Sequence, residues 1–143
     1  MGADKADVIK HLEMLQGVIN RMAANSFVVK GWSVTLAAAL AALGAQSANQ
    51  WFVAFGLIPV IAFWGLDAYY LEKERSFRKL YDAVRKPFAD PAAQPVPLFS
   101  MNIGPYEGGF HAWWKTLWST SVAWVHGVIA VVLIIVLALV VIY

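Results

Sequence analysis

The chain has 143 residues, of which 60% are hydrophobic and only 14% are charged, and its mean hydropathy is +0.60. A soluble domain of this length cannot bury that much apolar surface in its own core, so we expect lipid to cover the remainder. The formal net charge of +2 gives no reason to expect a nucleic-acid partner. The absence of cysteine excludes disulfides, thiolate catalysis and cysteine-based metal sites.

Residues 4–26 are predicted to form an amphipathic helix. Its apolar residues follow one another at spacings of four, three, four and three and make a seam of about two heptads: Val8, Leu12, Leu15, Ile19 and Met22. Two interpretations remain open. The helix lies on the membrane or on a neighbouring segment, or the seam is a coiled-coil contact between copies of the chain. The segment is not expected to be a signal peptide, because it contains acidic residues and no continuous apolar run.

Three apolar stretches are predicted to cross a membrane as helices, and these are residues 27–45, 51–71 and 117–142. Pro59 is expected to kink the second of them. In the first, alanines recur every four residues, and such a ridge of small side chains favours close helix packing in lipid. The ridge consists of Ala37, Ala41 and Ala45.

Beyond the second stretch, the helix is predicted to continue out of the membrane as a charged segment, residues 72–86. Its basic side chains are candidates for docking a soluble partner or anionic headgroups, and they include Arg75, Arg78, Lys79 and Arg85. The alternative is a solvated face, because three acidic residues are interleaved with the bases. Pro87 is expected to end this helix. Residues 87–109 hold five of the six prolines and are predicted to be an irregular connector.

The distribution of lysine and arginine predicts an orientation. Three of the eleven lie in residues 1–26 and seven in residues 72–115, whereas the turn at residues 46–50 has none. The positive-inside rule therefore places the N-terminus and the 72–115 segment in the cytoplasm, with the turn and the C-terminus outside. The sequence thus predicts an all-α membrane protein with three transmembrane helices, an N-terminal amphipathic helix and a cytosolic extension of the second span.

Two charged residues inside the apolar stretches are predicted to pair. Lys30 and Asp67 lie 18 and 19 residues from the centre of the turn, so an antiparallel hairpin brings them to matching depth. Pairing would reduce the cost of an ionised side chain in a membrane, which is about 2.5–3.5 kcal/mol at the bilayer centre. We interpret the pair, within one chain or between neighbours, as a structural staple. The alternatives are a proton- or ion-linked site and unpaired side chains that reach the membrane surface.

His126 lies well inside the third apolar stretch. A lone intramembrane histidine can bind haem or chlorophyll, relay protons or make a packing hydrogen bond. The packing interpretation is favoured, because no second histidine stands at a ligand spacing. The sequence shows no basis for a serine, a base and an acid that converge for catalysis. We therefore expect no enzyme activity, no cofactor and no metal.

Three parts of the chain resemble a group of small, uncharacterised bacterial three-span membrane proteins: HLEMLQGVINRMAANSFVVKGWSVTL, FWGLDAYYLEKERSFRKLYDAVR and FSMNIGPY. The LDAYYLEKER stretch is the most specific part. Two spans followed by a charged helix are also similar in layout to the SLATT-type membrane effectors of bacterial defence systems, which are proposed to form pores when a partner senses a signal. This chain differs from them in its third span. The resemblance implies a location in the bacterial inner (cytoplasmic) membrane.

Two functions are predicted as alternatives. The first is a homo-oligomeric, channel-like or membrane-perturbing effector of a defence or stress system, favoured by the alanine ridge and the heptad seam. No span has a polar stripe along its whole length, so conduction would need a hydrophobic gate. The second is a non-catalytic accessory or scaffold subunit of a larger membrane complex, favoured by the aliphatic third span. The expected partners are the lipid bilayer, further copies of the chain and a cytosolic protein.

A single reporter thiol tests the orientation, because the chain has no cysteine of its own. Gln46→Cys is expected to react with a membrane-impermeant maleimide added to the outside of intact spheroplasts. Arg85→Cys is expected to react only after the membrane is opened. A Gln46→Cys variant that reacts only from the cytoplasmic side would contradict the predicted orientation.

Overall fold

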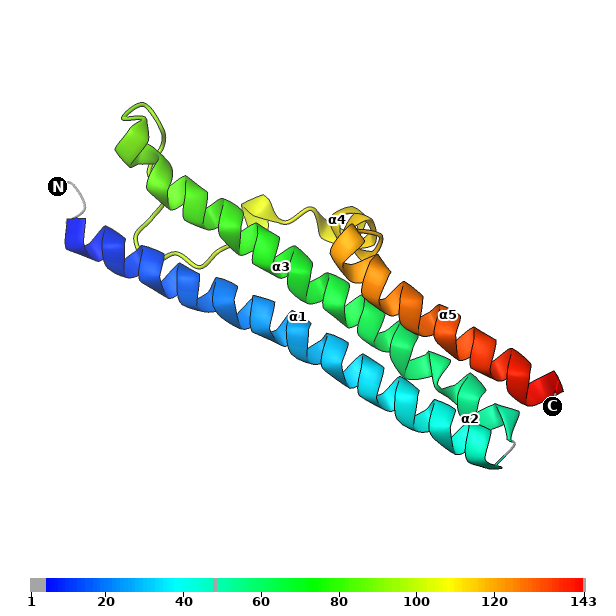
Figure 1. Ribbon diagram of the computed structural model, residues 1–143. Helices are drawn as coiled ribbons and strands as arrows, with labels where there is room; N and C mark the ends of the chain where they lie inside the picture. The colour runs from blue at the N-terminus through cyan, green and yellow to red at the C-terminus, as the bar shows by residue number, and fades with distance from the viewer. Residues whose placement is uncertain (1–4, 48, 143) are drawn as a thin grey trace.

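The computed structural model describes residues 5–47 and 49–142, and within these ranges the chain forms helices and no strand. The elements in chain order are α1 (Lys5–Ser47), α2 (Gln50–Phe55), α3 (Leu57–Ala89), the 3-10 helix η1 (Gly104–Tyr106), α4 (Gly109–Leu117) and α5 (Thr120–Ile142). Long rods formed by α1 and α3 run antiparallel, and α5 lies along the half of the bundle that adjoins α2 (Figure 1). The segments α1, α2–α3 and α5 are each long and apolar enough to cross a membrane.

Helix α1 is one continuous helix of 43 residues. The sequence predicted two elements here, residues 4–26 and 27–45, and residue 4 lies outside the described residues. No proline interrupts the run, so the backbone hydrogen bonds continue through the change from charged to apolar composition. At 1.5 Å per residue the helix is about 64 Å long, roughly twice the thickness of a bilayer's hydrocarbon core.

The N-terminal half of α1 packs against the C-terminal half of α3, and these two segments, residues 5–25 and 72–89, are called the stalk below. Its core consists of four buried side chains, Val8, Leu15, Leu80 and Val84. Burial of each such side chain stabilises the fold by about 1.5–3 kcal/mol. Of the predicted seam, Ile19 is also buried, and Leu12 and Met22 are partly buried. The seam therefore meets a neighbouring helix of its own chain.

The other half of the bundle has a separate apolar core made by α1, α2, α3 and α5. Its buried side chains are Ala37, Val53, Val60 and Leu133. The helices approach closely at Gly44, where an added Cβ would lie 2.2 Å from the Val53 side chain. Glycine at this position lets α2 pack directly on α1.

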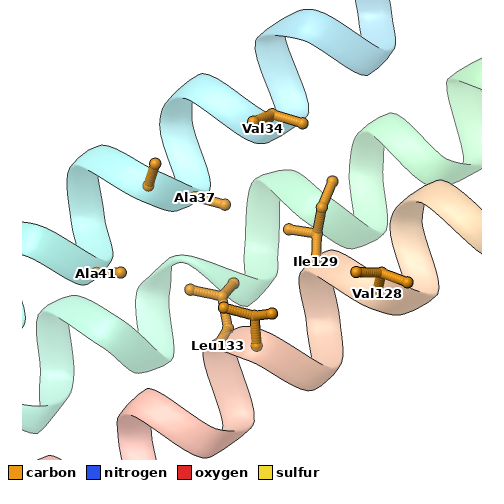
Figure 2. Close-up of a pocket in the computed structure, with 8 residues that line it drawn as sticks. Val34, Ala37, Ala41, Val128, Ile129 and Leu133 are labelled. Atoms are coloured by element: carbon orange, nitrogen blue, oxygen red, sulfur yellow. The ribbon is translucent and has the colours of Figure 1, made fainter.

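The predicted alanine ridge is only partly used in this core. Ala37 is buried and Ala41 is half-buried, whereas Ala45 is exposed. A groove of about 170 Å³ lies between α1 and α5 beside the first two. Figure 2 shows Val34, Ala37 and Ala41 on the α1 side, with Val128, Ile129 and Leu133 on the α5 side.

The second apolar stretch is interrupted at Gly56, three residues before Pro59. Asn49 caps the short helix α2, because its side-chain oxygen accepts a hydrogen bond from Trp51 N at 3.0 Å. Helix α3 begins at Leu57, so Pro59 falls in its first turn. A proline lacks an N–H donor and crowds the turn that precedes it, which places the break before the proline.

Helix α3 runs through Pro87 to Ala89, three residues beyond the predicted end at residue 86. A proline in the last turn leaves one carbonyl without a helical partner, which costs little where the helix is about to end. The backbone N–H of Asp90 donates to the Lys86 carbonyl at 2.9 Å and closes the helix. The predicted charged extension is thus continuous with the second apolar stretch.

The connector, residues 90–108, is docked along the stalk (Figure 1). Four of its side chains pack against the stalk core, and these are Val96, Met101, Ile103 and Tyr106. Lys73 Nζ lies 2.6 Å from Glu107 Oε1, and Lys79 Nζ donates to the Tyr106 carbonyl at 3.2 Å. The aromatic helix α4 follows. The third apolar helix, α5, begins at Thr120 rather than at residue 117, because the chain turns at residues 118–119.

Candidate functional site

A cluster of polar side chains lies where α1, α3 and α5 meet, within the apolar length of all three helices. Helix α1 contributes Ser26, Lys30 and Ser33, whose spacings of four and three residues place them on one face. Asp67 comes from α3 and His126 from α5. The side chains of Ser33, Asp67 and His126 have no exposed surface. These five residues are called the polar junction.

Asp67 is the centre of the polar junction. Its Oδ1 accepts hydrogen bonds from Lys30 Nζ at 2.7 Å and from the Ser26 hydroxyl. Its Oδ2 lies 3.2 Å from His126 Nε2. Lys30 Nζ also donates to Ser26 Oγ at 2.9 Å. One carboxylate therefore joins all three long helices.

His126 has a hydrogen-bond partner at each ring nitrogen and an aromatic partner on one face. Its Nδ1 lies 3.2 Å from Ser33 Oγ, and the Trp64 ring stacks on it with centroids 6.1 Å apart. A neutral imidazole with its proton on Nε2 donates to Asp67 and accepts from the Ser33 hydroxyl, so every polar atom is satisfied. Trp64 is fixed in turn, because its Nε1 donates to the Leu117 carbonyl at 2.9 Å.

The ion pair is formed within one chain, and it is largely shielded from solvent. The side chain of Lys30 is 20% exposed and that of Asp67 is not exposed at all. Removing two charges from water is costly, and their attraction offsets this cost only where further hydrogen bonds satisfy the remaining atoms. Ser26 and His126 supply those bonds to Asp67. Loss of one partner would leave an uncompensated charge among apolar helices.

The sequence predicted part of this arrangement. Lys30 and Asp67 were expected at one depth, and the structure brings them together. His126 was expected to make a packing contact, but its contact with Asp67 depends on where α5 lies, which no local pattern records. Ser26 and Ser33 were not singled out. The seam of α1 continues beyond Met22 with the same alternating spacing of four and three residues, and this spacing reaches Ser26 and Ser33. The sequence therefore contained a signal for these two residues.

The order Ser33–His126–Asp67 has the composition of a hydrolytic triad, an arrangement for which the sequence gave no basis. Catalysis would require a substrate carbonyl to reach the serine oxygen. Ser33 has no exposed surface, so its Oγ is closed to substrate in this packing. The apolar core that contains Val60 and Leu133 lies between the polar junction and the α2 end of the bundle. In this packing the polar junction links the three long helices.

The predicted docking residues are all engaged by their own chain. Arg78 pairs with Glu74 at 2.8 Å and Arg85 with Asp82 at 3.4 Å, and both arginine side chains are mostly exposed. These local pairs correspond to the solvated face that was kept as an alternative. Arg75 Nη1 donates to Thr116 Oγ1 at 3.1 Å, which ties α3 to α4. Lys79 holds the connector through the Tyr106 carbonyl, as described above.

A second histidine contact lies in the stalk and was not predicted. His11 is fully buried, and its Nε2 lies 2.9 Å from the Ser100 carbonyl, so it fastens the connector to α1. Its Nδ1 has no hydrogen-bond partner among the described residues. Over residues 5–47 and 49–142, no group of three or more histidine, cysteine or acidic side chains is placed to hold a metal ion.

No protein-family model, curated protein or solved structure matches this chain. The resemblance to small bacterial three-span membrane proteins therefore stays a prediction. The packing of the helices and the contacts of the polar junction are the grounds for a functional proposal.

Asp67→Asn tests the polar junction. The amide cannot neutralise the Lys30 ammonium, so we expect the free energy of unfolding in mild detergent to fall by about 3 kcal/mol. Lys30→Gln should also destabilise. The double variant should lose less than the sum of the two single variants, because the partners interact directly.

Asp82→Asn is the matched control, because it removes the same charge from an exposed pair. It should change the free energy of unfolding by no more than about 0.5 kcal/mol. Equal stability of Asp67→Asn and the unmodified protein would show that the polar junction does not hold the helices together.

Proposed function

We propose that this protein is a non-catalytic scaffold subunit of the bacterial inner membrane, with three spans, a cytoplasmic stalk and an external C-terminus. One observation carries the proposal. The polar side chains buried between the apolar helices, which are those of the polar junction, bond to one another. No buried polar atom of this set is left to bind a substrate or to line an aqueous path. Such a protein would function by binding other subunits of a complex and fixing their positions.

The dimensions of the bundle support the proposed topology. Lys30 lies 18 residues from the centre of the turn, or about 27 Å along the helix, which is close to the thickness of the hydrocarbon core. The polar junction would then lie near the cytoplasmic boundary, where the cost of burying charge is lower. The stalk would extend beyond this boundary, and its exposed ion pairs would be in water.

The stalk offers a surface for another subunit. A cleft of about 510 Å³ opens between α1 and α3 in the stalk, and its lining mixes apolar side chains with the amides of Gln16 and Asn20 and the carboxylate of Glu13. Ile9, which lines it, is 49% exposed. A soluble helix with a short apolar face fits such a cleft, because the exposed Ile9 gains burial and the amides of Gln16 and Asn20 supply hydrogen bonds at the rim.

A specific observation also favours the homo-oligomeric, channel-like effector as the second candidate. Ala38, Ala42 and Ala45 remain exposed on α1 at the level of the apolar core. In lipid, small side chains on an open helix face allow a second helix to approach closely. A ring of copies formed on this face would have an apolar lining, so it would conduct only through a hydrophobic gate.

Extraction of the protein from its native membrane into lipid nanodiscs, followed by native mass measurement, tests the scaffold proposal. We expect a second polypeptide at fixed stoichiometry. Ile9→Glu should release it, because the charge enters the apolar part of the stalk cleft. Met14→Glu is the control, because Met14 is also exposed but does not line the cleft. A defined homo-oligomer without a second polypeptide would contradict the scaffold.

The second candidate predicts a different response. Ala42→Leu should block close approach of copies and convert a homo-oligomer to monomer in nanodiscs. Ala39→Leu, an identical change at another exposed position of α1, should leave the mass unchanged. Planar-bilayer recordings of the purified protein should show current that Ala42→Leu abolishes. A monomeric unmodified protein without conductance would exclude the effector.

A further inference from the structure

A cleft of about 680 Å³ lies between α3 and the turn that joins α4 to α5. Its lining includes two cationic side chains, Arg75 and Lys115, together with Trp118 and the hydroxyls of Ser119, Thr120 and Ser121. The volume is in the range of small-ligand sites. The cleft opens at the proposed cytoplasmic boundary, because Arg75 lies eight residues, or about 12 Å, beyond Asp67 along α3.

The two cations in this cleft have no acidic partner among the described residues. Lys73, Arg78 and Arg85 nearby each form an ion pair, whereas Arg75 makes a single bond to the Thr116 hydroxyl. A guanidinium has five N–H donors, so most of those of Arg75 remain free. Lys115 makes no hydrogen bond within the described part of the chain. Two unneutralised cations in one cleft favour an anion between them.

An apolar groove of about 340 Å³ adjoins this cleft, and Trp118 lines both. The groove runs between α3 and α4, past Trp64, Trp114 and Leu117 to Ile61. Ile61 and Arg75 are 14 residues apart on α3, or about 21 Å along the helix. The cationic cleft and the apolar groove therefore follow one another along the axis of α3. A phospholipid in a bilayer has the same arrangement, with its charged headgroup above its acyl chains.

We infer that this surface binds an anionic phospholipid, with its phosphate between Arg75 and Lys115 and an acyl chain in the groove beside Trp118. The inference rests on the proposed membrane placement. Exposed tryptophans such as Trp118 lie at headgroup level, which sets the depth of the phosphate. The hydroxyls of Thr120 and Ser121 and the backbone N–H groups of these two residues, at the N-terminus of α5, supply further donors. A free phosphate ion would use the cleft but gain nothing from the groove.

Spin-labelled lipids in nanodiscs test the inference. We expect motionally restricted signals from both phosphatidylglycerol and phosphatidylcholine labels, with a higher relative association constant for phosphatidylglycerol. Each attractive cation contributes about a five-fold preference near a membrane surface. Arg75→Gln and Lys115→Gln should therefore each lower this constant about five-fold. Arg75→Gln also removes the hydrogen bond to Thr116 and could disturb the local structure. Lys115 makes no such bond, so the result for Lys115→Gln decides the test.

The control is the pair Arg78→Gln and Arg85→Gln, which removes equal charge from residues outside the cleft and should leave the preference unchanged. Excess inorganic phosphate should not displace the lipid. Equal association of the two lipids, or an equal loss in the control, would overturn the lipid site but leave the membrane placement intact. The absence of any restricted signal from either lipid would overturn the membrane placement itself.

Discussion

The burial of one carboxylate, that of Asp67, is the constraint on which the rest of the structure depends. An ionised oxygen between apolar helices needs partners at every acceptor position, and these partners come from two other helices. Lys30 and Ser26 fix the register of α1 against α3. His126 fixes the position of α5 on both. A slip of any of the three helices by one turn, about 5.4 Å, would break these bonds and leave the charge without partners among apolar side chains.

The polar junction also divides the bundle into two parts with different packing, although one face of α1 runs through both. In the stalk this face carries Leu15 and Ile19, which fill the space against α3 with large side chains. Beyond the polar junction it carries the small residues Ala37 and Gly44, and Gly44 lets α2 pack directly on α1. The first kind of packing draws on water exclusion, and the second draws on dispersion contacts, which is how helices associate in lipid. The change in side-chain size along α1 thus agrees with the proposed change of surroundings.

The connector gives the stalk its third layer. It is fastened by apolar side chains, by the ion pair of Lys73 with Glu107 and by His11 against the Ser100 carbonyl. These contacts hold the connector against the stalk, so its outer face forms an ordered surface. For a scaffold this matters, because a preordered surface loses less conformational entropy when a partner binds. The proposed lipid site lies where α4 leaves this region, and it would anchor the same corner of the bundle to the membrane.

The sequence by itself determined the helical class, the three apolar lengths and the meeting of Lys30 with Asp67. Each of these follows from composition, hydrophobic period or equal distance from a turn, and these quantities are local or depend on one hairpin. The tertiary structure alone decided that the seam of α1 meets α3 rather than a second copy, and that His126 reaches Asp67. It also placed the interruption of the second stretch at Gly56, three residues before Pro59. Those outcomes depend on which helix lies beside which, and a one-dimensional pattern does not record that choice, because an apolar face is satisfied equally by any apolar neighbour.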